Sequence, residues 1–251
     1  MLPKTNEKEK CDLSTEINMK QKVIILHGAL GSAQQFELIK NGLKDDFEVY
    51  LLDFDGHGNG NPTVGMSIEI FADNLLCFVE KNDLQNAAVF GYSMGGYVAL
   101  YLQTLHPNIF QAIITLGTKF NWSVESAEQE VKMLNTEKII EKVPTFAKYL
   151  ENIQAPTNWE LMMNQTIELM LRLGNKPLLT SENLNKISIP VTLCLGELDK
   201  MVSLEETQSV HQELKNSNLK ILKGVQHPIQ MIDPKVIIDL IKSQADSTPS
   251  M

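Results

Sequence analysis

The sequence predicts an α/β protein: a mostly parallel, twisted sheet with helices on both faces, interrupted by an inserted helical cap. Three observations predict it. Short β-branched and apolar runs alternate with amphipathic helical stretches, which is typical of parallel strands joined by crossover helices. These runs are apolar throughout, which suits strands that are covered on both faces. The alternation stops between residues 118 and 186, where helical patterns recur without a strand-like run.

Six runs are predicted as strands, four before residue 118 and two after residue 186. Each is short and rich in branched apolar residues, as strands are. The predicted strands are residues 23–26, 49–53, 88–90, 112–116, 191–195 and 219–222.

Three helices of the sheet region are predicted from their caps and apolar stripes. Ser67 can cap the first of them. The second is expected to begin near Met94 and to stop before Pro107, because proline cannot continue a helix. The third follows Pro234 and closes the chain. Their stripes are Ile68, Phe71, Leu75 and Phe78; Val98, Leu102 and Leu105; and Val236, Ile237, Leu240 and Ile241.

The stretch from residue 118 to residue 186 is too long for an ordinary connection, so we interpret it as a helical cap inserted into one core. Helical patterns occupy residues 131–134, 139–143, 146–150 and 161–173 of the cap. The core then comprises residues 21–117 and 187–243. Residues 1–20 are interpreted as a polar tail, and residues 244–251 as a second tail.

Composition restricts the kinds of partner. The 251 residues contain 31 Asp and Glu against 22 Lys and Arg, a net charge of −9. Because this charge repels phosphate backbones and anionic lipids, neither nucleic acid nor a membrane surface is expected as a partner. No apolar run reaches the roughly 18 residues that a membrane span needs, and residues 1–21 lack the apolar segment of a signal peptide. We therefore expect a cytoplasmic protein, and the sequence leaves its oligomeric state open.

Ser93 stands at the centre of the segment Gly91-Tyr92-Ser93-Met94-Gly95, between a predicted strand and a predicted helix. A sharp strand-to-helix turn strains its central residue, and glycines two positions to either side let the helix approach the strand. The pattern G-x-S-x-G therefore predicts an exposed serine at the carboxyl end of the sheet, in the position of a nucleophile.

A serine hydroxyl needs a neighbouring base, and the chain has five histidines. His27 ends a predicted strand, His57 lies in a glycine-rich turn, and His106 and His211 belong to helices. Only His227 follows a late strand in a loop, where strand ends collect at the catalytic edge of a sheet. We therefore predict His227 as the base.

The acid that orients the base is predicted from the segment after residue 195. Asp199 lies just beyond a predicted strand, so it projects from the same sheet edge as His227. The chain order Ser93, Asp199, His227 is the one expected for this architecture. Glu197 is the alternative acid, because either carboxylate can fall near the imidazole.

Acyl transfer also needs N–H donors for the oxyanion that develops on the substrate. Met94, the residue after the predicted nucleophile, supplies one from the start of a helix. The second is expected in the turn after the first strand, where Gly28 permits close approach and Ala29 offers its N–H. Leu30 is the neighbouring alternative.

No motif of the chain favours a cofactor or a metal. The segment Gly56-His57-Gly58-Asn59-Gly60 does not fit a dinucleotide loop, because its third glycine comes one residue early and Pro62 follows before any helix. The chain has neither a phosphate-binding P-loop motif nor an H-E-x-x-H zinc motif. No cofactor and no metal are expected.

Together these features resemble the α/β-hydrolase superfamily over residues 23–243, in particular its short, capped serine hydrolases such as carboxylesterases. The resemblance implies Ser93 as nucleophile, Asp199 and His227 as its partners, and the amides of Ala29 and Met94 as oxyanion hole. The matching pieces are His27-Gly28, the segment 53–58 (Asp-Phe-Asp-Gly-His-Gly), the segment 91–95, the segment 196–199 (Gly-Glu-Leu-Asp), and His227 followed by Asp233-Pro234.

Three features depart from the family pattern. Asp55 stands where proline is usual, and Gln226 stands where glycine commonly precedes the histidine. Only some twenty polar residues precede the first strand. This favours a sheet of fewer than eight strands, without the usual amino-terminal antiparallel ones.

Three functions are compatible with these residues. The leading hypothesis is a serine hydrolase that cleaves a small ester, thioester or related acyl bond through an acyl-enzyme, so that its partner is a small acyl substrate. The second is a lyase or C–C bond enzyme that uses the same serine, histidine and aspartate, since the segment 91–95 also resembles the corresponding segment of the menaquinone-pathway cyclohexadiene-carboxylate synthase. The third is a non-catalytic binding module on the same scaffold, because fold does not fix function.

The substrate pocket is expected to be apolar. Arg172 is the single arginine of the chain, and arginine is the residue best suited to clamp carboxylates and phosphates. Methionine, by contrast, is flexible and suits an adaptable apolar surface. Apolar side chains that the cap and its surroundings supply are Met133, Met162, Met170 and Met201, and the residues predicted to line the pocket are Leu30, Trp122, Trp159 and Met163.

Overall fold

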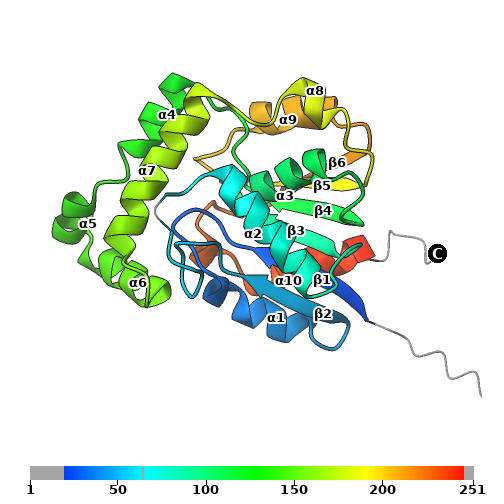
Figure 1. Cartoon of the computed structure of the whole chain (residues 1–251), viewed down its shortest axis with the longest axis horizontal. Helices are drawn as coiled ribbons and strands as arrows, with labels where there is room; N and C mark the ends of the chain where they lie inside the picture. Colours follow the sequence, from blue (N-terminus) through cyan, green and yellow to red (C-terminus); the bar gives the residue numbers. More distant parts are fainter. Residues whose placement is uncertain (1–19, 64, 246–251) are drawn as a thin grey trace, which may run out of the picture.

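The centre of the molecule is a six-stranded sheet in which every neighbouring pair of strands runs parallel (Figure 1). The computed structural model describes residues 20–63 and 65–245 of the chain. The strands follow the order β2-β1-β3-β4-β5-β6 across the sheet. Their bounds are β1 (Gln21–Leu26), β2 (Phe47–Leu52), β3 (Ala88–Tyr92), β4 (Ala112–Leu116), β5 (Val191–Gly196) and β6 (Ser217–Leu222).

All six predicted strands are present, with ends that lie within two residues of the predicted ones. The sheet that the described residues form therefore has fewer than eight strands, as the short segment before β1 led us to expect. The two predicted tails, residues 1–20 and 244–251, lie outside the described residues except at residues 20, 244 and 245. Residues 244 and 245 end the last helix and are not part of a tail.

The sheet is buried on both faces because alternate residues of each strand point to opposite sides. In β1, Val23 and Ile25 join one apolar cluster, and Ile24 and Leu26 join the other. Helices α1 (Glu37–Leu43) and α10 (Pro234–Ala245) pack on the first face, and α2 (Ile68–Lys81), α3 (Met94–Leu105) and α9 (Leu204–Glu213) contribute to the cluster on the second.

The caps of these helices follow the sequence. Ser67 begins α2 by accepting a hydrogen bond from the N–H of Ile70 at 3.2 Å. Phe78, which we expected in the buried stripe of α2, is only partly buried, and Val79 takes the buried position instead. The aromatic ring of Phe78 packs edge-on against Tyr50 of β2.

Between β4 and β5 the chain forms only helices. They are α4 (Val124–Val131), α5 (Thr136–Lys142), α6 (Pro144–Gln154), α7 (Trp159–Asn175) and α8 (Ser181–Leu184). Figure 1 shows α4, α5, α6 and α7 standing together to one side of the sheet, whereas α8 lies with α9. Residues 118–186 are called the helical insertion below.

The predicted helix at residues 131–134 is wrong, because α4 ends at Val131. The cause is local capping. The Ser123 hydroxyl accepts a hydrogen bond from Ser126 and begins α4, and the Asn135 side chain accepts one from Lys138 and begins α5. The apolar residues between them therefore lie at a helix end and in the following turn.

Because all six strands run parallel, the loops that follow their carboxyl ends lie at one edge of the sheet. β1 and β3 are neighbours, and the chain leaves β1 toward one side of the sheet and β3 toward the other. A crevice forms at such a switch point, beyond the carboxyl ends of the strands, and ligands bind there. Among the described residues, no helix is long and apolar enough to span a membrane.

Candidate active site

Ser93 occupies the strained turn that the sequence predicts. It follows β3 directly and precedes α3, with φ 51° and ψ −116°. Such positive φ values are costly for a residue with a side chain and persist where the surroundings enforce them. The N–H of Ser93 donates to the carbonyl of Leu116 at 2.8 Å, so the turn is fixed to the end of β4.

Two glycines let α3 approach the sheet behind Ser93. A Cβ added to Gly91 would lie 2.4 Å from the amide nitrogen of Gly96, and one added to Gly95 would lie 2.7 Å from the carbonyl oxygen of His27. Real Cβ atoms do not come this close to backbone atoms. The G-x-S-x-G pattern therefore has a steric cause here, and it sets the position of Ser93 relative to β1 and β3.

His227 and Asp199 form a buried pair. The Nδ1 atom of His227 lies 2.8 Å from Oδ2 of Asp199, and the two side chains expose 9% and 2% of their surface. Because an ionised carboxylate only accepts hydrogen bonds, Nδ1 carries the proton and Nε2 is left as an acceptor. Glu197, the alternative acid, accepts a hydrogen bond from the N–H of Gly224 at 2.9 Å instead.

The surroundings keep Asp199 ionised. Burial by itself raises the pKa of its carboxyl group, but the hydrogen bond from His227, and the positive charge of this imidazole when it is protonated, act in the opposite direction. The amides of Met201 and Val202 also donate to Oδ1, at 2.8 and 2.9 Å. Together these bonds outweigh burial, and the pKa of Asp199 lies below its usual value.

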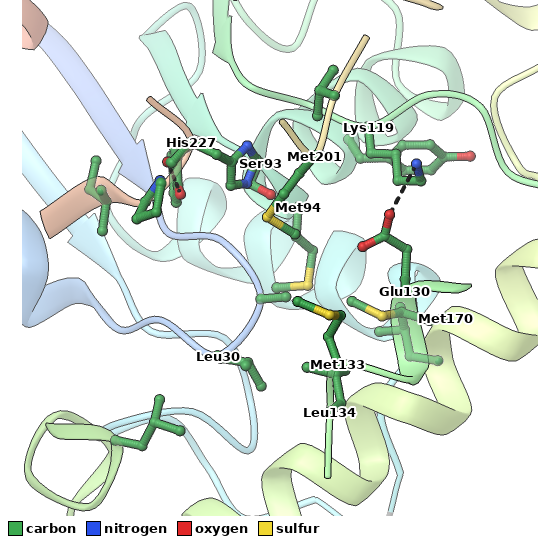
Figure 2. Close-up of a pocket in the computed structure, with 18 of the residues that line it drawn as sticks. Leu30, Ser93, Met94, Lys119, Glu130, Met133, Leu134, Met170, Met201 and His227 are labelled. Atoms are coloured by element: carbon green, nitrogen blue, oxygen red, sulfur yellow. Dashed lines mark hydrogen bonds and ion pairs between the residues drawn. The ribbon is translucent and has the colours of Figure 1, made fainter. Parts of the chain in front are cut away.

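Gly117 lies between the serine and the histidine. Its φ is +62°, and a Cβ at this position would lie 3.2 Å from Asp199 Oδ2 and from His227 Nδ1 and Cε1. Since Ser93 is bonded to the preceding residue, Leu116, the serine and the imidazole flank the same glycine. Both also line one cavity (Figure 2). The structure thus brings together the three residues that the sequence singles out.

Tyr92 also holds the imidazole, and the sequence did not single it out. Its hydroxyl donates to the carbonyl of His227 at 2.6 Å, and burial raises the pKa of Tyr92, so the phenol stays a donor. The tyrosine side chain therefore fixes the backbone that carries the imidazole. Its position directly before Ser93 in the segment 91–95 is the feature of the sequence that could have indicated a role in the site.

The turn after β1 reaches the serine as predicted. A Cβ on Gly28 would lie 3.0 Å from the Cβ of Ser93, so only glycine permits this approach. The N–H of Gly31 donates to the carbonyl of Gly28 at 3.1 Å and closes the turn, and Leu30 within it has φ 58°. Ala29 and Met94 are half-buried residues that line the cavity beside Ser93.

A buried histidine supports this turn from below. Nε2 of His27 accepts from the N–H of Phe54 at 3.2 Å, so Nδ1 carries the proton and donates to the carbonyl of Gly28 at 2.8 Å. Burial lowers the pKa of His27 and keeps it in this neutral form. The ring of His57, whose pKa burial also lowers, lies 4.9 Å away.

Gln154 fastens the helical insertion to the same turn. It ends α6 and is fully buried. Its side-chain NH₂ donates to the carbonyls of Leu30 at 3.0 Å and Gly31 at 2.7 Å, and its carbonyl accepts from the N–H of Gly58 at 2.9 Å. The insertion therefore holds the strained backbone next to Ala29 directly. Nothing in the sequence distinguished this glutamine from the other polar residues of the insertion.

A cavity of about 360 Å³ connects these groups with the helical insertion (Figure 2). Leu30 and Trp122 line it, as the sequence predicts. Trp159 and Met163 do not: both are buried in the apolar cluster on the second face of the sheet. The apolar periodicity of α7 predicts which face of this helix is buried, but it does not predict which turns of that face line the cavity. The apolar residues of the insertion that line it are Trp122, Met133, Leu134, Ile139, Phe146, Leu150, Leu169, Met170 and Leu173.

Known proteins share this architecture. The esterase of Thermogutta terrifontis, a thermophilic enzyme solved with malate bound, superposes with a TM-score of 0.72 over 91% of this chain and 90% of its own, at 19% sequence identity. At this identity the likeness establishes the fold. The α/β-hydrolase fold that the sequence predicts is therefore confirmed.

Relatives by sequence include an esterase and an acetyltransferase. The pimeloyl-[acyl-carrier protein] methyl ester esterase of Neisseria meningitidis is 23% identical over 82% of this chain and 86% of its own length. Ethanol acetyltransferase 1 of Hanseniaspora uvarum is 26% identical, but the match covers 39% of this chain and only 30% of that protein.

The resemblance to a hydrolase family is also confirmed at the level of the whole chain. The family described as Hydrolase_4, Serine aminopeptidase, S33, matches residues 17–234, which is most of the 251 residues. The matched range includes Ser93, Asp199 and His227. The chain belongs to this family of α/β-hydrolase enzymes.

Proposed function

We propose that this protein is a serine hydrolase that cleaves a small ester or thioester through an acyl-enzyme at Ser93. The observation that carries the proposal is the buried pair of His227 and Asp199, joined at 2.8 Å, beside a strained serine at one end of a largely apolar cavity. A serine, a base that can accept its proton and an acid that orients the base are the parts that acyl transfer requires.

In the proposed reaction, Nε2 of His227 takes the proton of the Ser93 hydroxyl while Oγ attacks the carbonyl carbon of the substrate. The negative charge that develops on the carbonyl oxygen is stabilised by the N–H groups of Ala29 and Met94. The C–O or C–S bond of the substrate then breaks, and the imidazolium gives its proton to the leaving alcohol or thiol. Water, activated by the same imidazole, releases the acid and restores Ser93.

The lining of the cavity supports an apolar acyl group as substrate. Among the described residues that line it, Lys119 is the one with a fixed positive charge, and Glu130 neutralises it at 3.2 Å. Arg172 lies elsewhere and donates to the carbonyl of Met66. This arrangement disfavours a substrate with several carboxylates, and so disfavours the lyase hypothesis. The name of the Neisseria relative, a methyl ester esterase, agrees with ester cleavage.

The first experiment is labelling with a fluorophosphonate probe followed by peptide mapping. An activated serine is phosphonylated, so we expect label on the peptide that contains Ser93 and none in Ser93→Ala. A folded protein that takes up no label, or takes it up at another serine, would contradict the proposal. The first of these results would favour the binding-module hypothesis.

The second experiment measures turnover of p-nitrophenyl esters with acyl chains of increasing length, beside esters of dicarboxylic acids. We expect a preference for neutral acyl chains of medium length. Ser93→Ala should lower kcat by about 10⁴ to 10⁶ without changing the melting temperature, because the hydroxyl performs the chemistry but buries little area. Selective cleavage of the charged esters would reject the apolar substrate class.

A further inference from the structure

Lys119 and Glu130 form an ion pair on the wall of the cavity, away from Ser93. Lys119 follows β4 by three residues, and Glu130 belongs to the last turn of α4. Their Nζ and Oε1 atoms lie 3.2 Å apart, and each side chain exposes 18% of its surface. Figure 2 shows the pair on one side of the cavity and Ser93 and His227 on the other, with Met94 and Met201 between them and Met133 and Met170 nearby.

The pair has hydrogen-bonding capacity that its mutual contact does not use. An ammonium group has three donors, and a carboxylate can accept at both oxygens. Among the described residues, no other hydrogen bond reaches Nζ of Lys119 or the carboxylate of Glu130. The ring of Trp122 lies 5.8 Å from Nζ and offers only its face. A ligand that fills the cavity therefore meets unused donors and acceptors beside an apolar channel.

The charges of the pair select the kind of group that fits. A carboxylate on the ligand would be attracted by Lys119 and repelled by Glu130 at nearly the same distance, and an ammonium group would meet the reverse. A neutral group avoids this conflict, because it can accept from the ammonium and donate to the carboxylate. A carboxamide presents its carbonyl oxygen and an N–H side by side, which is the complement of an ammonium and a carboxylate 3.2 Å apart.

We infer that the Lys119–Glu130 pair recognises a neutral carboxamide group on the substrate, separated from the scissile carbonyl by an apolar chain. This inference rests on the proposed function and names a substrate class for it. The serine end of the cavity then performs the cleavage, the methionines accommodate the chain, and the ion pair selects the polar group at its end. A ligand without such a group would leave the pair partly desolvated without compensation, which costs affinity.

The test compares p-nitrophenyl esters whose acyl chains have the same length and end in a carboxamide, a carboxylate or an isopropyl group. These three ends are nearly equal in shape and differ in charge and hydrogen bonding. The series is repeated with spacers from three to seven methylene groups, so that the spacing is found by measurement. For the best spacer, we expect kcat/KM of the carboxamide ester to exceed both others by about tenfold, the usual value of hydrogen bonds to charged groups.

Two variants assign the preference to the pair. In the double variant Lys119→Met, Glu130→Met, the ratio of carboxamide to isopropyl ester should fall to about one. Glu130→Gln leaves Lys119 without its counter-charge, so the carboxylate ester should become the better substrate. The matched control is Lys186→Met, Glu182→Met, which removes an exposed pair of the same residue types at 3.1 Å and should keep the wild-type ratio.

Each outcome decides the inference. Equal cleavage of the three esters by the wild-type protein, or preference for the carboxylate or isopropyl end, overturns it, whether or not the variants fold. A double variant that keeps the carboxamide preference also overturns it and makes the pair a structural contact between α4 and the segment after β4. Failure of the proposed function looks different, since no ester is then cleaved and Ser93 takes up no phosphonate label.

Discussion

The sheet edge and the helical insertion line the same cavity by different means. Ser93 stands directly at the end of β3, and Asp199 and His227 follow β5 and β6 within a few residues, so strand ends and tight backbone turns set their positions. Residues of the insertion such as Glu130 and Met170 reach the cavity only through side chains on packed helices. The first region fixes the groups that we propose to react, and the second shapes the rest of the cavity.

The two regions also differ in how strictly the structure restricts their sequence. At Gly91 and Gly95 no larger residue fits, because the backbone of a neighbouring segment lies against them. These positions therefore allow few substitutions, and the sequence of the sheet edge is narrowly determined. A helix of the insertion has no such restriction, because many apolar side chains satisfy the same packing. We therefore expect substitutions at the sheet edge to affect the reaction itself, and substitutions in the insertion to affect the choice of substrate. Gln154 joins the two regions.

The largest effect in this comparison is expected for Asp199→Asn. An asparagine can donate to Nδ1 of His227, so that the ring proton lies on Nε2. A protonated Nε2 cannot accept the proton of the Ser93 hydroxyl. We expect kcat/KM for a p-nitrophenyl ester to fall by about 10⁴ at neutral pH, with the fold retained by circular dichroism.

Glu197→Gln is the matched control for the acid. Its carboxylate accepts from Gly224 and not from the imidazole, so the variant should keep activity within a few-fold of the wild-type value. The reverse result, a small loss for Asp199→Asn and a large one for Glu197→Gln, would make Glu197 the orienting acid.

A smaller effect is expected for Gln154→Met, which cuts the junction between the two regions. Methionine keeps the volume but leaves the carbonyls of Leu30 and Gly31 and the N–H of Gly58 without their buried partner. The free energy of unfolding should fall by about 2 to 4 kcal/mol, since each such group costs about 1 kcal/mol or more. Because the turn that carries Ala29 loosens, kcat should fall by about 10- to 100-fold with KM nearly unchanged.

Thr157→Val separates these two consequences. The Thr157 hydroxyl donates to the carbonyl of Gly58 at 3.1 Å, and among the described residues it makes no hydrogen bond to the turn after β1. It should lower stability and leave kcat within about twofold. If Gln154→Met also lowers stability alone, with kcat unchanged, Gln154 is a packing residue and does not position the oxyanion donors.

The sequence predicted those parts of the molecule in which a local pattern is compatible with one structure only. Six apolar runs separated by crossover helices gave the parallel sheet, and the order of Ser93, Asp199 and His227 located three strand ends at one edge. The sequence favoured Asp199 but left Glu197 open as the alternative acid, because its exclusion depends on a contact between Glu197 and Gly224, which come from separate loops.

The insertion was predicted less well for a physical reason. Periodicity shows which face of α7 is buried, but Met163 and Met170 are two turns apart on similar faces, and only Met170 reaches the cavity. Polar residues of helices are normally solvated, so Glu130 and Gln154 gave no signal in the sequence. Their contacts depend on how the helices pack against residues far away in the chain.

The last prediction concerns the stability of the sheet edge as a function of pH. His27 and His57 are fully buried on the loops after β1 and β2. Burial lowers the pKa of both imidazoles, and the neighbouring His27 further lowers that of His57, well below its usual value. In the unfolded chain both titrate near pH 6.5, so below this pH the unfolded state binds protons that the folded state does not. The free energy of unfolding should therefore fall on acidification, by about 1.4 kcal/mol per pH unit for each histidine.

Urea denaturation between pH 7.5 and pH 5 measures this slope, and His57→Gln should reduce it by about one proton. The exposed His106→Gln is the control, since its ring contacts water in both states. A wild-type slope near zero, or an equal reduction in both variants, would show that the buried histidines do not limit the stability of this edge.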